Sequence, residues 1–186
     1  MEFTKDWFTH NIPTWSALLS KTNPRRVLEV GSHEGRSACW LIENCPLLIS
    51  LYCVDVWRDV AIEKRFDANT AAALVGKDVH VVKCKGLSAL KLSELAAIAP
   101  GSFDFIYIDG SHTAPDTLTD AVLAFQLLKV GGLLIFDDYL WFEDGHANPL
   151  LSPKIGIDAF VNIFAAQVTV LMGTPLYQLY LQKVSE

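Results

Sequence analysis

The stretch that decides the fold is Arg26-Val27-Leu28-Glu29-Val30-Gly31-Ser32-His33-Glu34-Gly35-Arg36-Ser37. Its first five residues are mainly apolar, which is typical of a strand buried on both faces of a parallel sheet. The glycines that follow let the backbone turn tightly and approach a ligand closely, and the N-terminus of the next helix offers free N–H groups. The stretch therefore predicts a strand, a ligand-binding loop and a helix in succession.

The same alternation repeats along the chain. Apolar runs predict parallel strands at 26–30, 49–56, 79–84, 103–108 and 133–136. The segments between them predict helices at 37–43, 63–74, 88–98 and 115–128, the last ended by Gly131-Gly132. Repeated strand–helix–strand units indicate parallel strands joined by right-handed crossovers. We therefore expect an α/β fold with a doubly wound, Rossmann-like sheet, formed as a single domain over residues 1–186.

The C-terminal part departs from this pattern. A helix is expected at 157–166, followed by strands at 168–172 and 176–181. Only Gly173-Thr174-Pro175 separates these two strands, and a connection this short permits only an antiparallel hairpin. The sheet is therefore predicted to be mostly parallel with a C-terminal antiparallel hairpin. The loop 143–153, which is rich in turn residues, is a candidate active-site lid.

Composition excludes several classes of protein. The 186 residues are 51% hydrophobic and carry a formal charge of −6, which argues against a nucleic-acid partner. No apolar run reaches the roughly 18 to 20 residues of a membrane helix, and we expect neither a membrane partner nor a signal peptide. The four cysteines are Cys39, Cys45, Cys53 and Cys84. Most of them lie within or beside apolar runs, which predicts free buried thiols and a cytoplasmic protein. A homo-oligomer is compatible with the sequence.

The loop after the first strand distinguishes between nucleotide ligands. A dinucleotide fingerprint needs Gly-x-Gly-x-x-Gly, but His33 stands where its second glycine would be. Glu29 would repel a pyrophosphate, whereas it can bind a cationic ligand group or anchor the loop. Taken alone, the two glycines also fit a plain tight turn with Ser37 as the helix cap.

An acidic residue followed by Gly-x-x-x-Gly, as in Glu29, Gly31 and Gly35, resembles the first motif of class I S-adenosylmethionine-dependent methyltransferases. The resemblance covers nearly the whole chain and points most closely to small bacterial O-methyltransferases, grouped with catechol-type and macrolide-sugar enzymes. It implies S-adenosylmethionine as cofactor, a small-molecule methyl acceptor and an N-terminal cap over residues 1–23. Its further motifs are Asp55-Val56-Trp57, Ile108-Asp109-Gly110-Ser111-His112, Phe136-Asp137-Asp138-Tyr139 and Gly156-Ile157-Asp158-Ala159-Phe160.

The resemblance implies a set of cofactor-binding residues. Asp55 ends the second strand, where a carboxylate can accept hydrogen bonds from both vicinal hydroxyls of a ribose. Gly86 and Ser88 follow the third strand and are assigned to the adenine, although Ser88 is equally typical of a helix cap. The remaining cofactor positions lie at the ends of the first and fourth strands: Glu29, Gly31, Ser32, Gly35, Ser37 and Asp109.

Acidic residues end two neighbouring strands. Asp109 ends the fourth strand, and Asp137 and Asp138 end the fifth, so their carboxylates should converge. Converging carboxylates repel one another unless a cation or protons compensate, which predicts Mg²⁺ or another divalent cation. The alternative is that these residues only cap turns. His112 should face the same cavity, so His112 and Asp109 are the predicted catalytic residues, with His112 taking a proton from an acceptor hydroxyl. The spacing of His112 is equally compatible with a residue that caps the following helix or bonds to a carboxylate.

Three functions remain open at this point. The first is O-methyl transfer to a small molecule with metal assistance. The second is a non-catalytic S-adenosylmethionine- or nucleoside-binding protein, which would need no acidic cluster. The third is a nicotinamide-dependent dehydrogenase, which His33 disfavours. Among the histidines, only His112 receives a role; His10, His33, His80 and His146 receive none.

Overall fold

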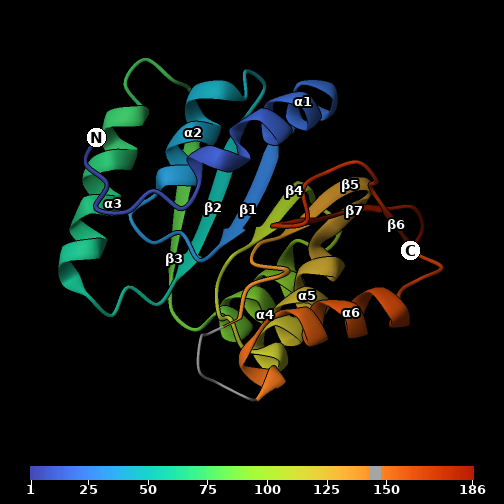
Figure 1. Ribbon diagram of the computed structural model, residues 1–186. Coiled ribbons are helices and arrows are strands. Elements are labelled where there is room, and N and C mark those ends of the chain that lie inside the picture. Colours follow the sequence, from blue (N-terminus) through green and yellow to red (C-terminus); the bar gives the residue numbers. More distant parts are fainter. Residues whose placement is uncertain (143–147) are drawn as a thin grey trace.

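The computed structural model describes residues 1–142 and 148–186. Within them, one seven-stranded sheet has the order β3-β2-β1-β4-β5-β7-β6 (Figure 1). The first five strands are parallel: β1 (Arg26–Val30), β2 (Ser50–Asp55), β3 (His80–Lys85), β4 (Phe103–Ile108) and β5 (Leu128–Phe136). β7 (Leu179–Lys183) runs antiparallel to both β5 and β6 (Val168–Val170). The predicted parallel sheet with its C-terminal hairpin is confirmed, although the last strand begins at Leu179 and residues 171–178 connect the two strands, where the sequence predicts only 173–175.

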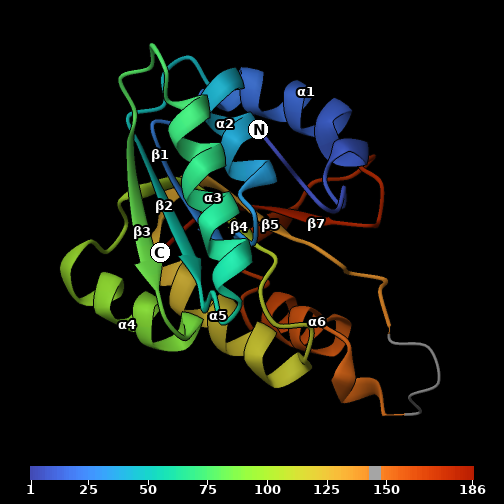
Figure 2. The same ribbon diagram turned by 90° about the vertical axis from the view of Figure 1, so that its left-hand side faces the viewer.

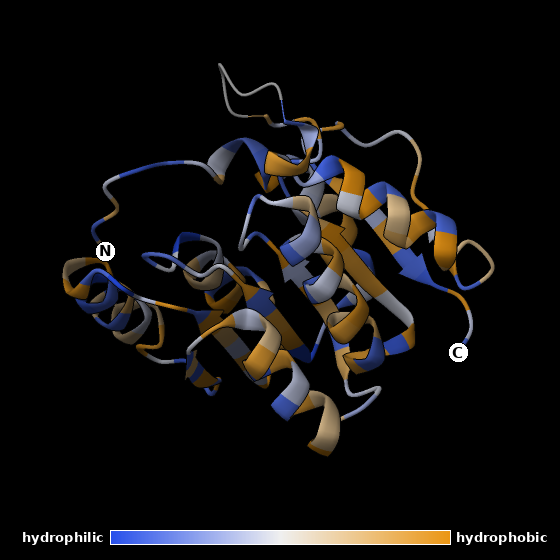
Figure 3. Ribbon diagram, turned by 90° about the horizontal axis from the view of Figure 1, so that it is seen from below, coloured by the Kyte–Doolittle hydropathy of each residue, from blue (hydrophilic) through white to orange (hydrophobic). Residues whose placement is uncertain are grey.

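Helices cover both faces of this sheet (Figures 1 and 2). One face carries α1 (Ile12–Thr22), α2 (Arg36–Asn44) and α3 (Val60–Ala73). The other carries α4 (Ser88–Ile98), α5 (Ala114–Leu127) and α6 (Lys154–Ile163). The strands between the two layers are largely apolar, as the orange ribbons of Figure 3 show.

Each face has its own hydrophobic core, because successive side chains of a strand point to opposite faces. In β4, Phe105 and Tyr107 contact the buried indole of Trp15, which α1 contributes. Ile106 and Ile108 pack with the core on the other face. The segment predicted as an N-terminal cap thus supplies a helix that seals one face of the sheet.

The junction between α5 and β5 differs from the prediction. The strand is expected at 133–136, but it begins at Leu128, directly after the helix ends at Leu127. Gly131, at φ 85°, lies inside the strand, where the pairing with β4 shifts register. The Lys183 ammonium donates to the carbonyl oxygens of Phe125 and Leu128, which satisfies acceptors where the helix ends.

The described part of the predicted lid leads into α6, which begins earlier than the sequence predicts. Residues 143–147 of the lid, with His146, lie outside the described residues, and Pro149–Leu151 form a 3-10 turn capped by the Asn148 side chain. A second such turn, Thr9–Asn11, precedes α1. α6 begins at Lys154, one turn before the predicted start, and Pro153 is its N-cap residue.

The burial of the cysteines and the length of the helices bear on two other expectations. Cys39, Cys45 and Cys53 are buried free thiols, as predicted, and Cys84 is partly buried. Among residues 1–142 and 148–186, no helix is long and apolar enough to cross a membrane.

Candidate active site

A cavity of about 1160 Å³ opens at the carboxyl ends of the parallel strands. Ligands bind at this edge in open α/β sheets, where the winding of the strands reverses. The loops after all five parallel strands contribute to its lining, and the N-terminal segment and Tyr177 close it from the side. Five of the predicted cofactor residues line the cavity: Gly31, Asp55, Gly86, Ser88 and Asp109.

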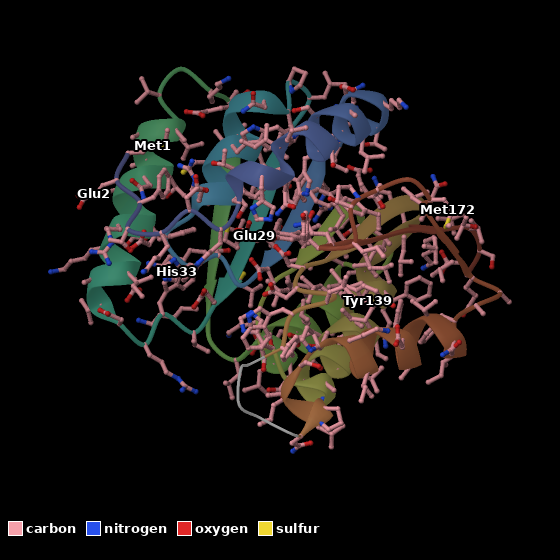
Figure 4. The ribbon with its side chains drawn as sticks, viewed as in Figure 1. Met1, Glu2, Glu29, His33, Tyr139 and Met172 are labelled. Carbon is pink, nitrogen blue, oxygen red and sulfur yellow. The ribbon has the colours of Figure 1, made fainter. Side chains whose placement is uncertain are left out.

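Glu29, which is labelled in Figure 4, is not among the residues that line this cavity. The carboxylate is fully buried and accepts a hydrogen bond from the Ser37 hydroxyl. Burial raises the pKa of Glu29 to about 7. Glu29 therefore ties the start of α2 to β1, which fits the expectation that it anchors the loop.

Ser32, Gly35 and Ser37 are buried as well and lie outside the cavity lining. Gly35, at φ 80°, is the N-cap residue of α2, so Ser37 is not the cap that one interpretation of the sequence expects. These residues shape the loop, and their contact with a ligand stays a prediction.

The Asp55 carboxylate is fixed by two backbone amides. The N–H of His33 donates to Oδ2 and the N–H of Trp57 donates to Oδ1, each at 2.8 Å. Both donors have left-handed backbones, at φ 46° for His33 and 37° for Trp57. The Trp57 indole also donates to the His33 carbonyl oxygen at 2.8 Å. Asp55 is thus held at the cavity wall with its remaining lone pairs free to accept hydrogen bonds.

His33 and Trp57 are therefore part of the site, although sequence reasoning gives His33 no role. Its position inside the glycine loop is the available signal. The Trp57 side chain packs in the core, with its ring centroid 4.6 Å from that of Phe66.

The acidic residues of β4 and β5 converge as the topology requires. The Tyr107 hydroxyl lies between two of them, 3.0 Å from Asp109 Oδ2 and hydrogen-bonded to Asp137 Oδ2. Asp137 also accepts from the Gln178 amide at 3.0 Å. Burial, followed by the neighbouring carboxylates, raises the pKa of Asp109, and burial is also the main cause of the raised pKa of Asp137.

The side chains that meet in the cavity are Asp109, His112 and Asp138. One ligand atom from each lies within 4.8 Å of the other two. His112 Nε2 is 2.8 Å from Asp138 Oδ2, and this hydrogen bond raises the pKa of His112. The sequence places Asp137 in the metal set, whereas the geometry groups His112 with the other two residues. The two carboxylates offer the oxygen ligands that a divalent cation such as Mg²⁺ prefers, and the imidazole lies beside them.

Sequence reasoning does not find Tyr107 and Gln178. Tyr107 is two residues before Asp109 on one strand, so the period of two gives a signal that both side chains share a face. Gln178 lies far along the chain, just before β7, and no motif marks it.

Two comparisons of the sequence with known proteins bear on the family of the chain. A family model described as a methyltransferase domain matches residues 28–139, more than half of the chain. A curated relative, uncharacterized protein R132 of Acanthamoeba polyphaga mimivirus, is 25% identical over 129 residues, which cover 69% of this chain and 56% of that protein. The chain therefore spans little more than half the length of this relative.

Solved O-methyltransferases have a similar fold. TomG from Streptomyces achromogenes, in complex with S-adenosylmethionine, is 21% identical, with a TM-score of 0.70 over 92% of this chain and 78% of TomG. The Bacillus cereus enzyme in complex with S-adenosylhomocysteine is 19% identical, with a TM-score of 0.71 over 97% and 84%. MycE from the mycinamycin pathway, in complex with Mg, S-adenosylhomocysteine and mycinamycin VI, is 17% identical, with a TM-score of 0.69 over 97% and 51%.

Structural similarity at these sequence identities shows the fold alone. The family model, in contrast, matches the amino-acid sequence of this chain. That match begins in β1 and ends just after Asp137 and Asp138, so it includes the loops on either side of the cavity. The chain belongs to the methyltransferase-domain family.

Proposed function

We propose that the chain binds S-adenosylmethionine and transfers its methyl group to a hydroxyl oxygen of a small molecule. One observation carries the proposal: a single cavity joins Asp55, at the end of β2, to Asp109, His112 and Asp138, beyond β4 and β5. A methyl donor held at one end would thus face an acceptor held at the other. TomG and the Bacillus cereus enzyme, which bind the donor and its product, support this assignment.

The cavity has the chemistry that the cofactor needs. The fixed Asp55 carboxylate can accept hydrogen bonds from both ribose hydroxyls. Gly86 and Ser88 line the adjoining wall, where an adenine would lie. The volume of about 1160 Å³ exceeds the roughly 300 to 1,000 Å³ of ordinary ligand pockets, so donor and acceptor can bind together.

The acidic end fits a divalent cation such as Mg²⁺, which MycE binds. Asp109 and Asp138 would hold it, beside His112. When bound, such a cation stabilises the negative charge that develops on the acceptor oxygen. A cation would also offset the repulsion between these carboxylates.

The residues of the chain would position the acceptor and accept its proton. The cavity walls hold the acceptor hydroxyl in line with the donor's methyl group, which is the main source of acceleration for such a displacement. The His112 imidazole accepts the hydroxyl proton, and Asp138 orients the ring. The new oxygen–methyl bond forms as the sulfur–methyl bond breaks, which releases S-adenosylhomocysteine and an O-methylated product.

A transfer assay tests this function. The purified chain is incubated with S-adenosylmethionine carrying a labelled methyl group and a panel of phenols, sugars, polyketide alcohols and amines, with chelator or with Mg²⁺. We expect label in at least one acceptor, loss of transfer with chelator and recovery with Mg²⁺. Full transfer in chelator would contradict the metal assignment, and label found only on nitrogen acceptors would contradict O-methylation. Asp109→Asn, which removes one carboxylate that would hold the cation, should reduce the transfer, and Asp78→Asn at an exposed position is its matched control.

A further inference from the structure

We propose that Gln178 is a positioning residue that holds the acidic end of the cavity in place through Asp137. The proposal rests on the proposed function, because the site that Gln178 would support is the divalent-cation site. Gln178 has no exposed surface and lies just before β7, behind the acidic residues. A fully buried amide needs hydrogen-bond partners for both its ends, and here they fix its orientation.

The carbonyl end of Gln178 is held by two donors. The Trp15 indole N–H donates to Oε1 at 2.8 Å, and the Tyr180 hydroxyl donates to the same atom at 2.5 Å. An indole nitrogen can only donate, so the oxygen of the amide must face Trp15. The NH₂ group of Gln178 is therefore directed the other way, toward the site.

That NH₂ group donates to Asp137 Oδ2 at 3.0 Å, beside the bond from the Tyr107 hydroxyl. The other oxygen of Asp137 accepts the backbone N–H of Asp138 at 2.8 Å. Asp138 has a left-handed backbone, at φ 56°, and its carboxylate meets His112. Asp137 thus connects the buried donors to the turn that presents Asp138 to the cavity.

Removing Gln178 would disturb this chain of contacts in a specific way. Asp137 lies next to two other carboxylates, and the donors on its buried side offset their repulsion. Without the amide, Asp137 would keep the Tyr107 hydroxyl but lose the other of its two buried side-chain donors. The carboxylate that accepts the Asp138 N–H would then be held less firmly. Groups that orient metal ligands in this way typically change metal affinity by roughly 10- to 100-fold when mutated.

Gln178→Leu is the direct test, and Gln182→Leu is its matched control. Gln182 lies on β7 and is more exposed, and its side chain bonds only to the Gly131 carbonyl oxygen among the described residues, away from the cavity. Mn²⁺ alone is titrated calorimetrically into each protein, and S-adenosylhomocysteine is titrated in parallel. We expect Gln178→Leu to weaken Mn²⁺ binding about 10- to 100-fold, with S-adenosylhomocysteine affinity nearly unchanged and with Gln182→Leu matching the wild type.

A second variant keeps the test decisive if Gln178→Leu does not fold. Tyr107→Phe removes the other buried donor to Asp137 and keeps the packed ring, so it should also weaken Mn²⁺ binding. Unchanged Mn²⁺ affinity, or an equal loss of Mn²⁺ and S-adenosylhomocysteine affinity, would overturn the role of Gln178 alone. A wild type that binds no Mn²⁺ would overturn this role and the metal assignment, while its S-adenosylhomocysteine titration reports separately on the cofactor site.

Discussion

A side chain on Gly31 would place its Cβ 1.8 Å from the backbone carbonyl oxygen of Asp109. The loop after β1 and the end of β4 are therefore in backbone contact at the middle of the cavity. Gly31 also has φ 91°, a conformation that other residues rarely adopt. Close approach and backbone conformation thus require glycine independently.

Gly31→Ala should destabilise the protein more than Gly76→Ala. Gly76 has a similar backbone, at φ 74°, but no described atom lies within 4 Å of its Cβ position. The control should cost about 1 to 2 kcal/mol for the left-handed conformation, and Gly31→Ala should cost more because of the clash. Urea unfolding of both variants measures the difference, and equal costs would show that the contact with Asp109 relaxes freely.

His112→Ala should lower kcat by roughly 10² to 10⁴, the usual span for loss of a general base. S-adenosylhomocysteine affinity should hardly change, because His112 lies on the acceptor side with Asp138 and Trp141. His80→Ala, at an exposed position on β3, is the control. Steady-state kinetics with a responsive acceptor make the comparison, and an unchanged kcat would leave His112 as a partner of Asp138 only.

Asp120→Asn should stabilise the protein at neutral pH. Asp120 is buried, and neither carboxylate oxygen has a hydrogen-bond partner among the described residues. Burial raises its pKa from 3.8 to about 6. The folded state thus binds the proton more tightly, and the stability that protonation provides is lost as pH rises from about 4 through 6.

The gain from Asp120→Asn should reach about 3 kcal/mol above pH 6, since one pKa unit corresponds to about 1.4 kcal/mol. It should vanish below about pH 4, where the wild type is protonated in both states. Denaturant unfolding across this range, with the exposed Asp78→Asn as control, measures the difference. A stability difference that does not depend on pH would refute the buried-carboxyl explanation.

The sequence predicts the carboxyl ends of the five parallel strands to within one residue, because short apolar runs between polar residues have clear limits, whereas both strands of the C-terminal hairpin differ from their predicted bounds. Asp55 and Asp109 can therefore be placed at one edge of the sheet from the sequence alone. The α5–β5 junction is harder, since Leu127 and Leu128 belong to one apolar run and Gly131-Gly132 resembles a helix end. Tertiary contacts, including those of Lys183, decide where that helix ends.

The direction of side chains at the site cannot be predicted in the same way. Asp137 and Asp138 are neighbours in sequence, yet one bonds to Gln178 and the other to His112. Gln178 is 41 residues from Asp137 and comes from the segment that leads into β7, the neighbour of β5 in the sheet. A contact of this kind depends on the finished fold, so no local pattern encodes it. Glu29 shows the same limit, because its burial follows from packing on both faces.

Calorimetric titration of S-adenosylhomocysteine into the wild type and Asp55→Ala tests the central claim most directly. The wild type should bind, and Asp55→Ala should lose most of the affinity because the ribose hydroxyls lose their fixed acceptor. Asp78→Ala, at an exposed position, should bind as the wild type does. A wild type that binds NAD but not S-adenosylhomocysteine would contradict the account, as would equal affinity in the wild type and Asp55→Ala.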